Sequence, residues 1–180
     1  MKQLVIQIDT REQYPLLFPD TITVPDENSP HNATCILKIK QEKIKLDSGE
    51  YRLAEFPKAC VIERKGSQSE LIKNLFDPQD AQRTARSLTR LRQSCIYPYL
   101  LLECTPSSLL APTPLLHHPE LLINKLTLMV ARFGLHMLWT TTPTSVGARR
   151  SLGTIVLHTL YALRNKLPDY LPQPESIEAP

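Results

Sequence analysis

The chain has 180 residues, of which 42% are hydrophobic and 22% charged, and its 21 basic and 18 acidic residues give a net charge of +3. The length predicts one domain with a full hydrophobic core, and the absence of any apolar run near roughly 18 residues predicts that no segment spans a membrane. A charge this small excludes a bulk polycation, so a nucleic-acid site would have to come from local clustering of basic residues.

The N-terminus and the cysteines indicate an intracellular protein. The first residues, Met1 to Leu4, lead directly into a strand pattern without the features of a signal peptide. The four cysteines have no CxxC or other metal-binding spacing, and three lie in apolar or strand-like surroundings. This pattern favours buried reduced thiols over a disulfide framework.

The first predicted element is a central strand over residues 4–9, which is apolar on both faces. It ends in the sequence Asp9-Thr10-Arg11-Glu12. Acidic residues at the carboxyl end of a strand stand where α/β proteins usually build their sites. Taken alone, Asp9 is explained equally well as the cap of the turn that follows.

Residues 13–34 are irregular, because four prolines exclude a helix, with a short edge strand at residues 21–24. Apolar and basic residues alternate over residues 35–40 and again over residues 43–46. This predicts two strands around a turn at Gln41-Glu42. The exposed lysines of these strands fit either phosphate contacts or a solvated sheet edge that they protect from aggregation.

A hairpin is predicted next, with one strand starting at Glu50 and the other formed by Ala59 to Lys65. A turn centred between Phe56 and Pro57 would place Glu50 opposite Glu63, where Cβ atoms lie roughly 4.5–5.5 Å apart. Two opposed carboxylates need a cation between them or a proton on one of them. Mg²⁺ is the natural candidate, because it is usually held by one or two carboxylates with water and phosphate.

The charged end of this second strand divides between the two faces of the sheet. Side chains alternate along a strand, so Glu63 and Lys65 are expected on one face and Arg64 on the other. A carboxylate and an ammonium on the same face predict a metal site with a neighbouring cation.

Two helices are expected after Lys65. Ser67 and Glu70 form a capping-box pattern at the start of a short helix, which ends at Asp77-Pro78. The second helix covers residues 79–93, and its arginines at spacings of three and four share one face: Arg83, Arg86 and Arg90. Such a row is either a solvated face or, beside a catalytic strand, a phosphate clamp.

The rest of the chain alternates strands and helices. We expect a buried strand at residues 97–104, a loop at 105–118, a helix at 119–133, a strand at 135–140 and a last helix from 143 or 144 to about 166. Arg149 and Arg150 near the start of the last helix could face a ligand or solvent. Residues 167–180 contain four prolines and are expected to form a disordered tail, which leaves residues 1–166 as the domain.

The order of elements predicts an α/β fold with a mixed central sheet flanked by helices. No Gly-rich phosphate loop and no GxSxG motif is present, which argues against a nucleotide-binding fold or an α/β-hydrolase.

These motifs together resemble the nuclease domain of the XPF/Hef-type structure-specific endonucleases, in the compact single-domain form of phage and bacterial proteins. The family has Asp-x-Arg-Glu, then Gly-Asp-Tyr, then Glu-Arg-Lys followed by a short helix. Here these elements are matched by Asp9-Thr10-Arg11-Glu12, Gly49-Glu50-Tyr51 and Glu63-Arg64-Lys65, in order and each in a matching strand context. The resemblance covers roughly residues 4–165.

The resemblance implies a restriction-endonuclease-like fold and cleavage of DNA phosphodiester bonds with Mg²⁺ or Mn²⁺. It implies that Glu50 and Glu63 hold the metal, with Asp9 in the same acidic cluster as a third metal ligand, and that Lys65 positions and activates the attacking water. Arg11, Glu12 and Arg64 would organise this cluster.

The resemblance also implies partners and a location. The expected substrate is branched or flapped DNA in repair or recombination, and the expected protein partner is a second copy or a nuclease or helicase. The location would be cytoplasmic and nucleoid-associated in a bacterium or phage host, and nuclear in a eukaryote.

One residue departs from the family pattern, because Glu50 stands where the family has Asp. The extra methylene moves the carboxylate by about 1.5 Å. This leaves open a catalytically weak module that binds DNA or supports a nuclease partner. A third hypothesis is an interaction domain whose charges form surface salt bridges, although two opposed glutamates argue against it.

Overall fold

The computed structural model describes residues 2–26, 29 and 33–164. Its strands are β1 (Gln3–Asp9), β2 (Thr21–Pro25), β3 (Thr34–Ile44), β4 (Tyr51–Leu53), β5 (Cys60–Lys65), β6 (Tyr97–Glu103) and β7 (His136–Thr140). Its helices are α1 (Gln68–Phe76), α2 (Pro78–Ser94), α3 (Pro106–Leu109), α4 (Glu120–Phe133) and α5 (Val146–Ala162). The predicted tail, residues 167–180, lies outside the described residues.

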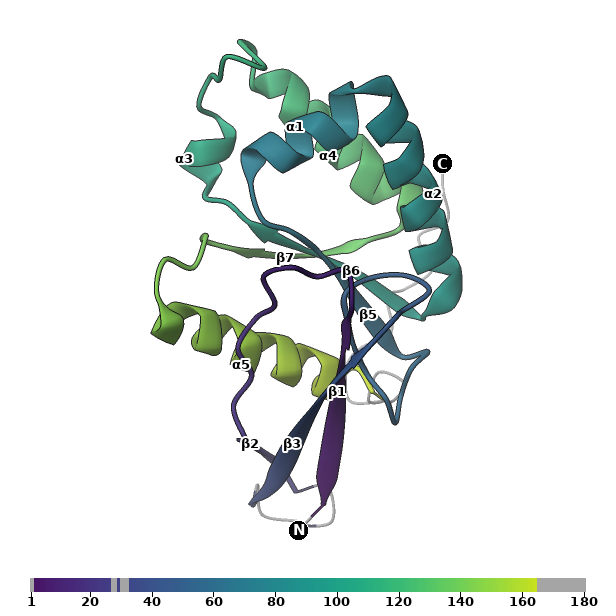
Figure 1. Ribbon diagram of the computed structural model, residues 1–180, viewed down its shortest axis with the longest axis vertical. Coiled ribbons are helices and arrows are strands. Elements are labelled where there is room, and N and C mark those ends of the chain that lie inside the picture. The colour runs from purple at the N-terminus through teal and green to yellow at the C-terminus, as the bar shows by residue number, and fades with distance from the viewer. Residues whose placement is uncertain (1, 27–28, 30–32, 165–180) are drawn as a thin grey trace, which may run out of the picture.

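The strands form one mixed sheet in the order β2-β3-β1-β4-β5-β6-β7, with α1, α2 and α4 over one face and α5 over the other (Figure 1). This confirms the predicted α/β architecture. Strand β1 pairs antiparallel with β4, β4 pairs antiparallel with β5, and β5, β6 and β7 are parallel. Strands β1, β5 and β6 therefore run in the same direction. Their carboxyl ends lie at the same end of the sheet as the start of β4.

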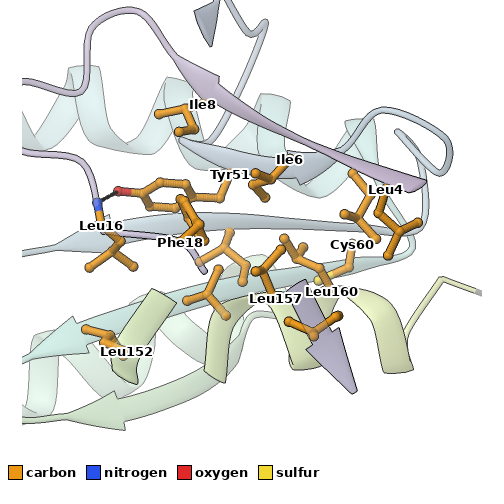
Figure 2. Packing of buried hydrophobic residues seen from close by; sticks show 14 of the residues in the cluster. Leu4, Ile6, Ile8, Leu16, Phe18, Tyr51, Cys60, Leu152, Leu157 and Leu160 are labelled. Atoms are coloured by element: carbon orange, nitrogen blue, oxygen red, sulfur yellow. Dashed lines mark hydrogen bonds between the residues drawn. The ribbon is translucent and has the colours of Figure 1, made fainter. Parts of the chain in front are cut away.

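Alternation along the strands divides the hydrophobic core between the two faces of the sheet. Ile62 and Tyr51 belong to the cluster that packs under α5, whereas Val61 belongs to the cluster under α1, α2 and α4. The Tyr51 hydroxyl accepts a hydrogen bond of 3.1 Å from the Leu16 N–H (Figure 2). This bond fixes the segment that follows β1 against the α5 side of the sheet.

The starts of α1 and α2 follow from their capping residues. The Ser67 hydroxyl accepts a hydrogen bond from the Glu70 N–H, as predicted for the N-cap of α1. The second half of the capping box is not formed, because the Glu70 carboxylate accepts from the Gly66 N–H and from Lys65 instead. Asp77 ends α1 and caps α2 by accepting hydrogen bonds from two N–H groups of its first turn.

Two predictions about local structure are wrong. The expected turn at Gln41-Glu42 is absent, because residues 34–44 form one strand whose partners on β1 run from Gln3 to Asp9. Gln and Glu have no preference for the backbone angles of a tight turn. Residues 34–38 pair with β2 and residues 38–44 pair with β1, so the ladder with β1 runs through Gln41 and Glu42 without a break. The predicted loop at 105–118 contains the short helix α3, which starts at the Thr105 cap.

Two further expectations concern the membrane and the cysteines. No helix in the part of the chain that the structure describes is long and apolar enough to cross a bilayer. All four cysteines are free, and three of them are buried: Cys60, Cys95 and Cys104.

Candidate active site

The acidic residues singled out in the sequence meet at the edge of the sheet where β1 and β5 end and β4 begins. Asp9 is the last residue of β1, Glu63 and Lys65 end β5, and Glu50 immediately precedes β4. The three acidic residues line a hollow of about 120 Å³, called here the acidic hollow, and Lys65 lies beside it in contact with Glu63. The complete lining is Asp9, Arg11, Gly49, Glu50, Glu63 and Ser87. Ser87 comes from α2, so this helix forms one wall of the hollow.

Gly49 allows the chain to approach β5 closely just before β4. Its φ of 69° lies in the left-handed region, and a Cβ atom there would stand 2.3 Å from the Val61 Cγ1. The β4–β5 ladder pairs Tyr51 with Ile62, and the Glu50 N–H donates to the Ile62 carbonyl at 2.8 Å. Glycine is therefore required at this position, and it places Glu50 over the end of β5.

The Glu50 carboxyl group lies beside the backbone of β5, and its attraction to Lys65 only partly offsets the effects that raise its pKa. Its Oε2 accepts a hydrogen bond of 3.1 Å from the Arg64 N–H. No ion pair joins it to any other residue that the structure describes. The residue keeps some solvent contact, but protein atoms crowd its carboxyl group, and this burial, followed by repulsion from Glu63 and Glu12, raises the pKa of Glu50 to about 9. Without a metal, Glu50 holds a proton at neutral pH.

Lys65 lies on the same face as Glu63, as the alternation along β5 predicts. Its Nζ is 2.9 Å from Glu63 Oε1 and 3.2 Å from Glu70 Oε1. Burial lowers the pKa of Lys65, but attraction to these two carboxylates outweighs it, and the net pKa is raised. Lys65 therefore remains an ammonium ion and can only donate hydrogen bonds.

Asp9 is held by Arg11. The Arg11 guanidinium donates to both Asp9 oxygens, at 2.7 and 2.9 Å, and the Arg11 and Leu46 N–H groups donate to the same carboxylate. Burial raises the pKa of Asp9, but these hydrogen bonds outweigh it, and the pKa is lowered overall. In this arrangement, Asp9 could bind a metal ion only if Arg11 released one of the two Asp9 carboxylate oxygens.

Arg64 points to the opposite face of the sheet, as predicted, and connects three segments there. Its guanidinium makes two hydrogen bonds, of 2.6 and 2.8 Å, to Glu103 at the end of β6. It also donates to the Glu12 carboxylate and to the Tyr14 carbonyl, both at 3.2 Å. Arg64 thus fixes the segment after β1 to the ends of β5 and β6.

A larger hollow of about 550 Å³, called here the Tyr14 hollow, adjoins the acidic hollow and shares Arg11 and Glu50 with it. Its other walls come from the segment after β1, the start of α1 and the chain between β7 and α5. The complete lining is Arg11, Glu12, Gln13, Tyr14, Glu50, Arg64, Gly66, Ser67, Glu70, Glu103, Thr142, Pro143 and Arg149.

The predicted DNA-contacting arginines are not all equally close to these hollows. The three on α2 are exposed: Arg83, Arg86 and Arg90. None of them lines the acidic hollow, but Ser87, four residues after Arg83 and three before Arg90, does. Arg149 lines the Tyr14 hollow and donates to the Pro15 carbonyl, whereas Arg150 is exposed and lines neither of the two hollows.

Ten residues of these hollows were not singled out as site residues from the sequence: Gln13, Tyr14, Gly49, Gly66, Ser67, Glu70, Ser87, Glu103, Thr142 and Pro143. Ser87 could have been found, because it shares a helical face with Arg83 and Arg90. Glu103 stands at the carboxyl end of an apolar strand, and its burial and its pairing with Arg64 give it a structural role. Tyr14 carries no local signal in the sequence.

The carboxylates of the acidic hollow are the donor groups available for the expected Mg²⁺ or Mn²⁺ ion. Among the described residues, no group of three or more His, Cys, Asp or Glu side chains is placed to hold a metal ion. Mg²⁺, however, needs only one or two carboxylates when water and phosphate oxygens complete its shell. Glu50 and Glu63 supply that number of oxygen ligands, and the repulsion between them is one that a divalent cation would relieve. The residues present therefore fit Mg²⁺ or Mn²⁺.

No protein-family model matches the chain, and no curated protein matches it. Among solved structures, it is similar to XPF from Aeropyrum pernix, with a TM-score of 0.51, 18% identity, and coverage of 84% of this chain and 61% of that one. The chain has the restriction-endonuclease-like fold of XPF. It is also similar to XPF from Aeropyrum pernix in complex with DNA, with a TM-score of 0.53, 16% identity, and coverage of 87% and 62%.

The fold likeness to XPF confirms the fold that the sequence motifs predicted. The chain spans about 61–62% of the length of these XPF structures, so the comparison concerns part of XPF only.

Proposed function

We propose that this chain is a divalent-metal-dependent endonuclease that cleaves DNA phosphodiester bonds at branched or flapped sites in repair or recombination. One observation carries the proposal: Glu50 and Glu63 line one hollow beside Lys65, and Glu50 makes no ion pair with any residue that the structure describes. The order of the motifs and the XPF fold support the same conclusion.

Each residue of the acidic hollow has a role in this proposal. Glu50 and Glu63 hold the Mg²⁺ or Mn²⁺ ion, with the Arg64 carbonyl as a further ligand and Asp9 as a reserve carboxylate. The ion would lower the pKa of a water molecule and offset the charge that develops on the phosphate. Lys65 stays protonated, donates hydrogen bonds that position the attacking water, and adds fixed positive charge where the oxyanion forms.

The remaining charged residues organise the site. Arg11 holds Asp9, while Arg64 binds Glu12 and fixes the segment after β1. These ion pairs would hold the side chains of the acidic hollow in position before the substrate binds. Such preorganisation contributes to catalysis.

The proposed substrate is held by basic residues around the acidic hollow. The exposed arginines of α2 lie next to Ser87 and would contact phosphates on either side of the scissile bond. The XPF structure with a similar fold that is in complex with DNA supports DNA as the ligand. As partners we propose a second copy of the chain or a nuclease or helicase, in the cytoplasm of a bacterium or the nucleus of a eukaryote.

Cleavage assays test the proposal. Flap, fork, Holliday-junction and linear DNA are incubated with Mg²⁺ or Mn²⁺ and the wild-type protein, Glu63→Ala or Lys65→Ala. We expect metal-dependent cleavage that both substitutions abolish. Glu120→Ala, at an exposed residue whose partner is His118, is the matched control and should cleave as wild type does. Cleavage that persists in Glu63→Ala would refute the assignment.

A second candidate function is a weak or inactive relative that binds DNA or supports a nuclease partner. Two observations favour it: both oxygens of Asp9 are occupied by Arg11, and Glu replaces Asp at position 50. DNA binding without cleavage would support this alternative, and failure to bind Mn²⁺ in a calorimetric titration would leave only an interaction domain. If the endonuclease proposal is right, Glu50→Asp preserves or raises activity, and a large loss would show that the proposed placement of this ligand is wrong.

A further inference from the structure

The Tyr14 hollow contains an aromatic ring that the proposed chemistry does not use. Tyr14 is 72% exposed, although large aromatic side chains are usually covered. The ring lines a hollow that shares Arg11 and Glu50 with the acidic hollow, so whatever occupies it lies next to the scissile phosphate. A volume of about 550 Å³ falls in the range of small-molecule sites, which is roughly 300–1,000 Å³.

The segment that carries Tyr14 is fixed although its side chain is exposed. The Tyr14 N–H donates to Glu12 Oε1 at 2.8 Å, and its carbonyl accepts from Arg64 at 3.2 Å. The next residues are held as well, because Arg149 donates to the Pro15 carbonyl and the Leu16 N–H donates to the Tyr51 hydroxyl (Figure 2). A ring on an anchored backbone binds a flat partner with little loss of conformational entropy.

The charges of the Tyr14 hollow favour an uncharged ligand. Glu12 and Glu103 are paired with Arg64, and Glu70 is paired with Lys65. Three arginines of the lining (Arg11, Arg64 and Arg149) stand against these three carboxylates, and Glu50 adds no charge at neutral pH while its pKa stays near 9. The lining therefore offers an aromatic face and hydrogen-bonding groups with its charges close to balance. Such a surface suits a nucleobase, whereas a phosphate would be held better by the arginines of α2.

We propose that the Tyr14 hollow binds one unpaired nucleobase next to the scissile phosphate, stacked on the Tyr14 ring. This inference rests on the proposed function, because it takes the acidic hollow as the place of the scissile phosphate. A base that is paired inside a duplex cannot turn outward into the Tyr14 hollow. Tyr14 would therefore favour DNA that has an unpaired nucleotide at the cleavage position. Bases of every kind stack on aromatic rings, so Tyr14 would distinguish DNA by its structure and not by its sequence.

Equilibrium binding and a fluorescent base test the proposal. Flap DNA with 2-aminopurine in the unpaired nucleotide at the junction, and a fully paired linear duplex, are titrated with protein in the presence of Ca²⁺, which also takes oxygen ligands. The proteins are wild type, Tyr14→Ala, Tyr14→Phe, and Ile96→Ala as a control at an exposed residue at the other end of the sheet.

We expect Tyr14→Ala to weaken flap binding by about 5- to 100-fold, the loss that removing one stacked base produces. We expect much less change with the duplex. The 2-aminopurine fluorescence should be quenched by wild type and by Tyr14→Phe, which keeps an aromatic ring, and by the control, but not by Tyr14→Ala. Equal quenching by Tyr14→Ala and wild type, or equal weakening on flap and duplex, would overturn the proposal.

The outcomes separate this inference from the proposed function. Tyr14-dependent flap binding without metal-dependent cleavage would overturn the endonuclease while the base site stands. Cleavage that needs Glu63, together with flap binding that ignores Tyr14, would overturn the base site alone. Failure of the wild-type protein to bind either DNA would overturn both.

Discussion

The charge on Glu50 should make the metal-free protein less stable as the pH rises. The pKa of this group is about 9 in the fold because of burial and repulsion from Glu63 and Glu12, against 4.5 for a free carboxyl group. The folded state therefore keeps a proton that the unfolded chain releases. The stabilisation is complete below pH 4.5 and is lost as the pH rises toward 9.

The size of this effect follows from linkage. One proton held only in the folded state changes the free energy of unfolding by at most about 1.4 kcal/mol per pH unit. Between pH 5.5 and 7.5 the contribution of Glu50 is therefore up to about 2.7 kcal/mol. Glu50→Gln removes it, since a glutamine side chain does not titrate.

Urea denaturation followed by far-UV circular dichroism measures this effect in EDTA at pH 5.5, 6.5 and 7.5. The stability of wild type should fall relative to Glu50→Gln across this range, and saturating Mg²⁺ should reduce the difference, because the ion stabilises the ionised carboxylate. Asp47→Asn, at an exposed carboxylate nearby, should keep the wild-type slope. Parallel curves for wild type and Glu50→Gln would refute the reasoning, since they would mean that Glu50 is ionised without a metal.

Three further predictions concern packing, a buried ion pair and DNA affinity. Gly49→Ala should lower the free energy of unfolding by about 1–3 kcal/mol in urea, because its Cβ would overlap Val61; an unchanged midpoint would contradict the left-handed turn. Glu103→Ala should lower the free energy of unfolding by about 3–5 kcal/mol, because it leaves Arg64 with only its longer pair to Glu12, and Glu103→Leu with Arg64→Met should recover part of that loss if the Glu103 pair is the cause. Arg90→Ala should reduce the slope of log Kd against log salt for DNA by about 0.9 in anisotropy titrations, and a slope equal to that of the control Lys58→Ala would exclude a phosphate contact.

Local sequence patterns predicted most of the elements and the order of the site motifs. Apolar runs located β1, β5 and β6, since a strand buried on both faces has to be continuously apolar. Ser67 located the start of α1, because its side chain satisfies an N–H group that the helix itself leaves unpaired. The alternation of Glu63, Arg64 and Lys65 fixed which face each would occupy.

Long-range pairing decided what those patterns left open. Residues 34–44 form one strand because β2 pairs with its first half and β1 with residues 38–44. Nothing in the sequence Gln41-Glu42 itself indicates that β1 lies beside it. Likewise Arg64 binds Glu103, a residue 39 positions away, and Asp9 is taken by Arg11, which leaves Glu50 without an ion-pair partner among the described residues. Which cation neutralises which carboxylate depends on distances across the sheet, and only the tertiary structure sets these.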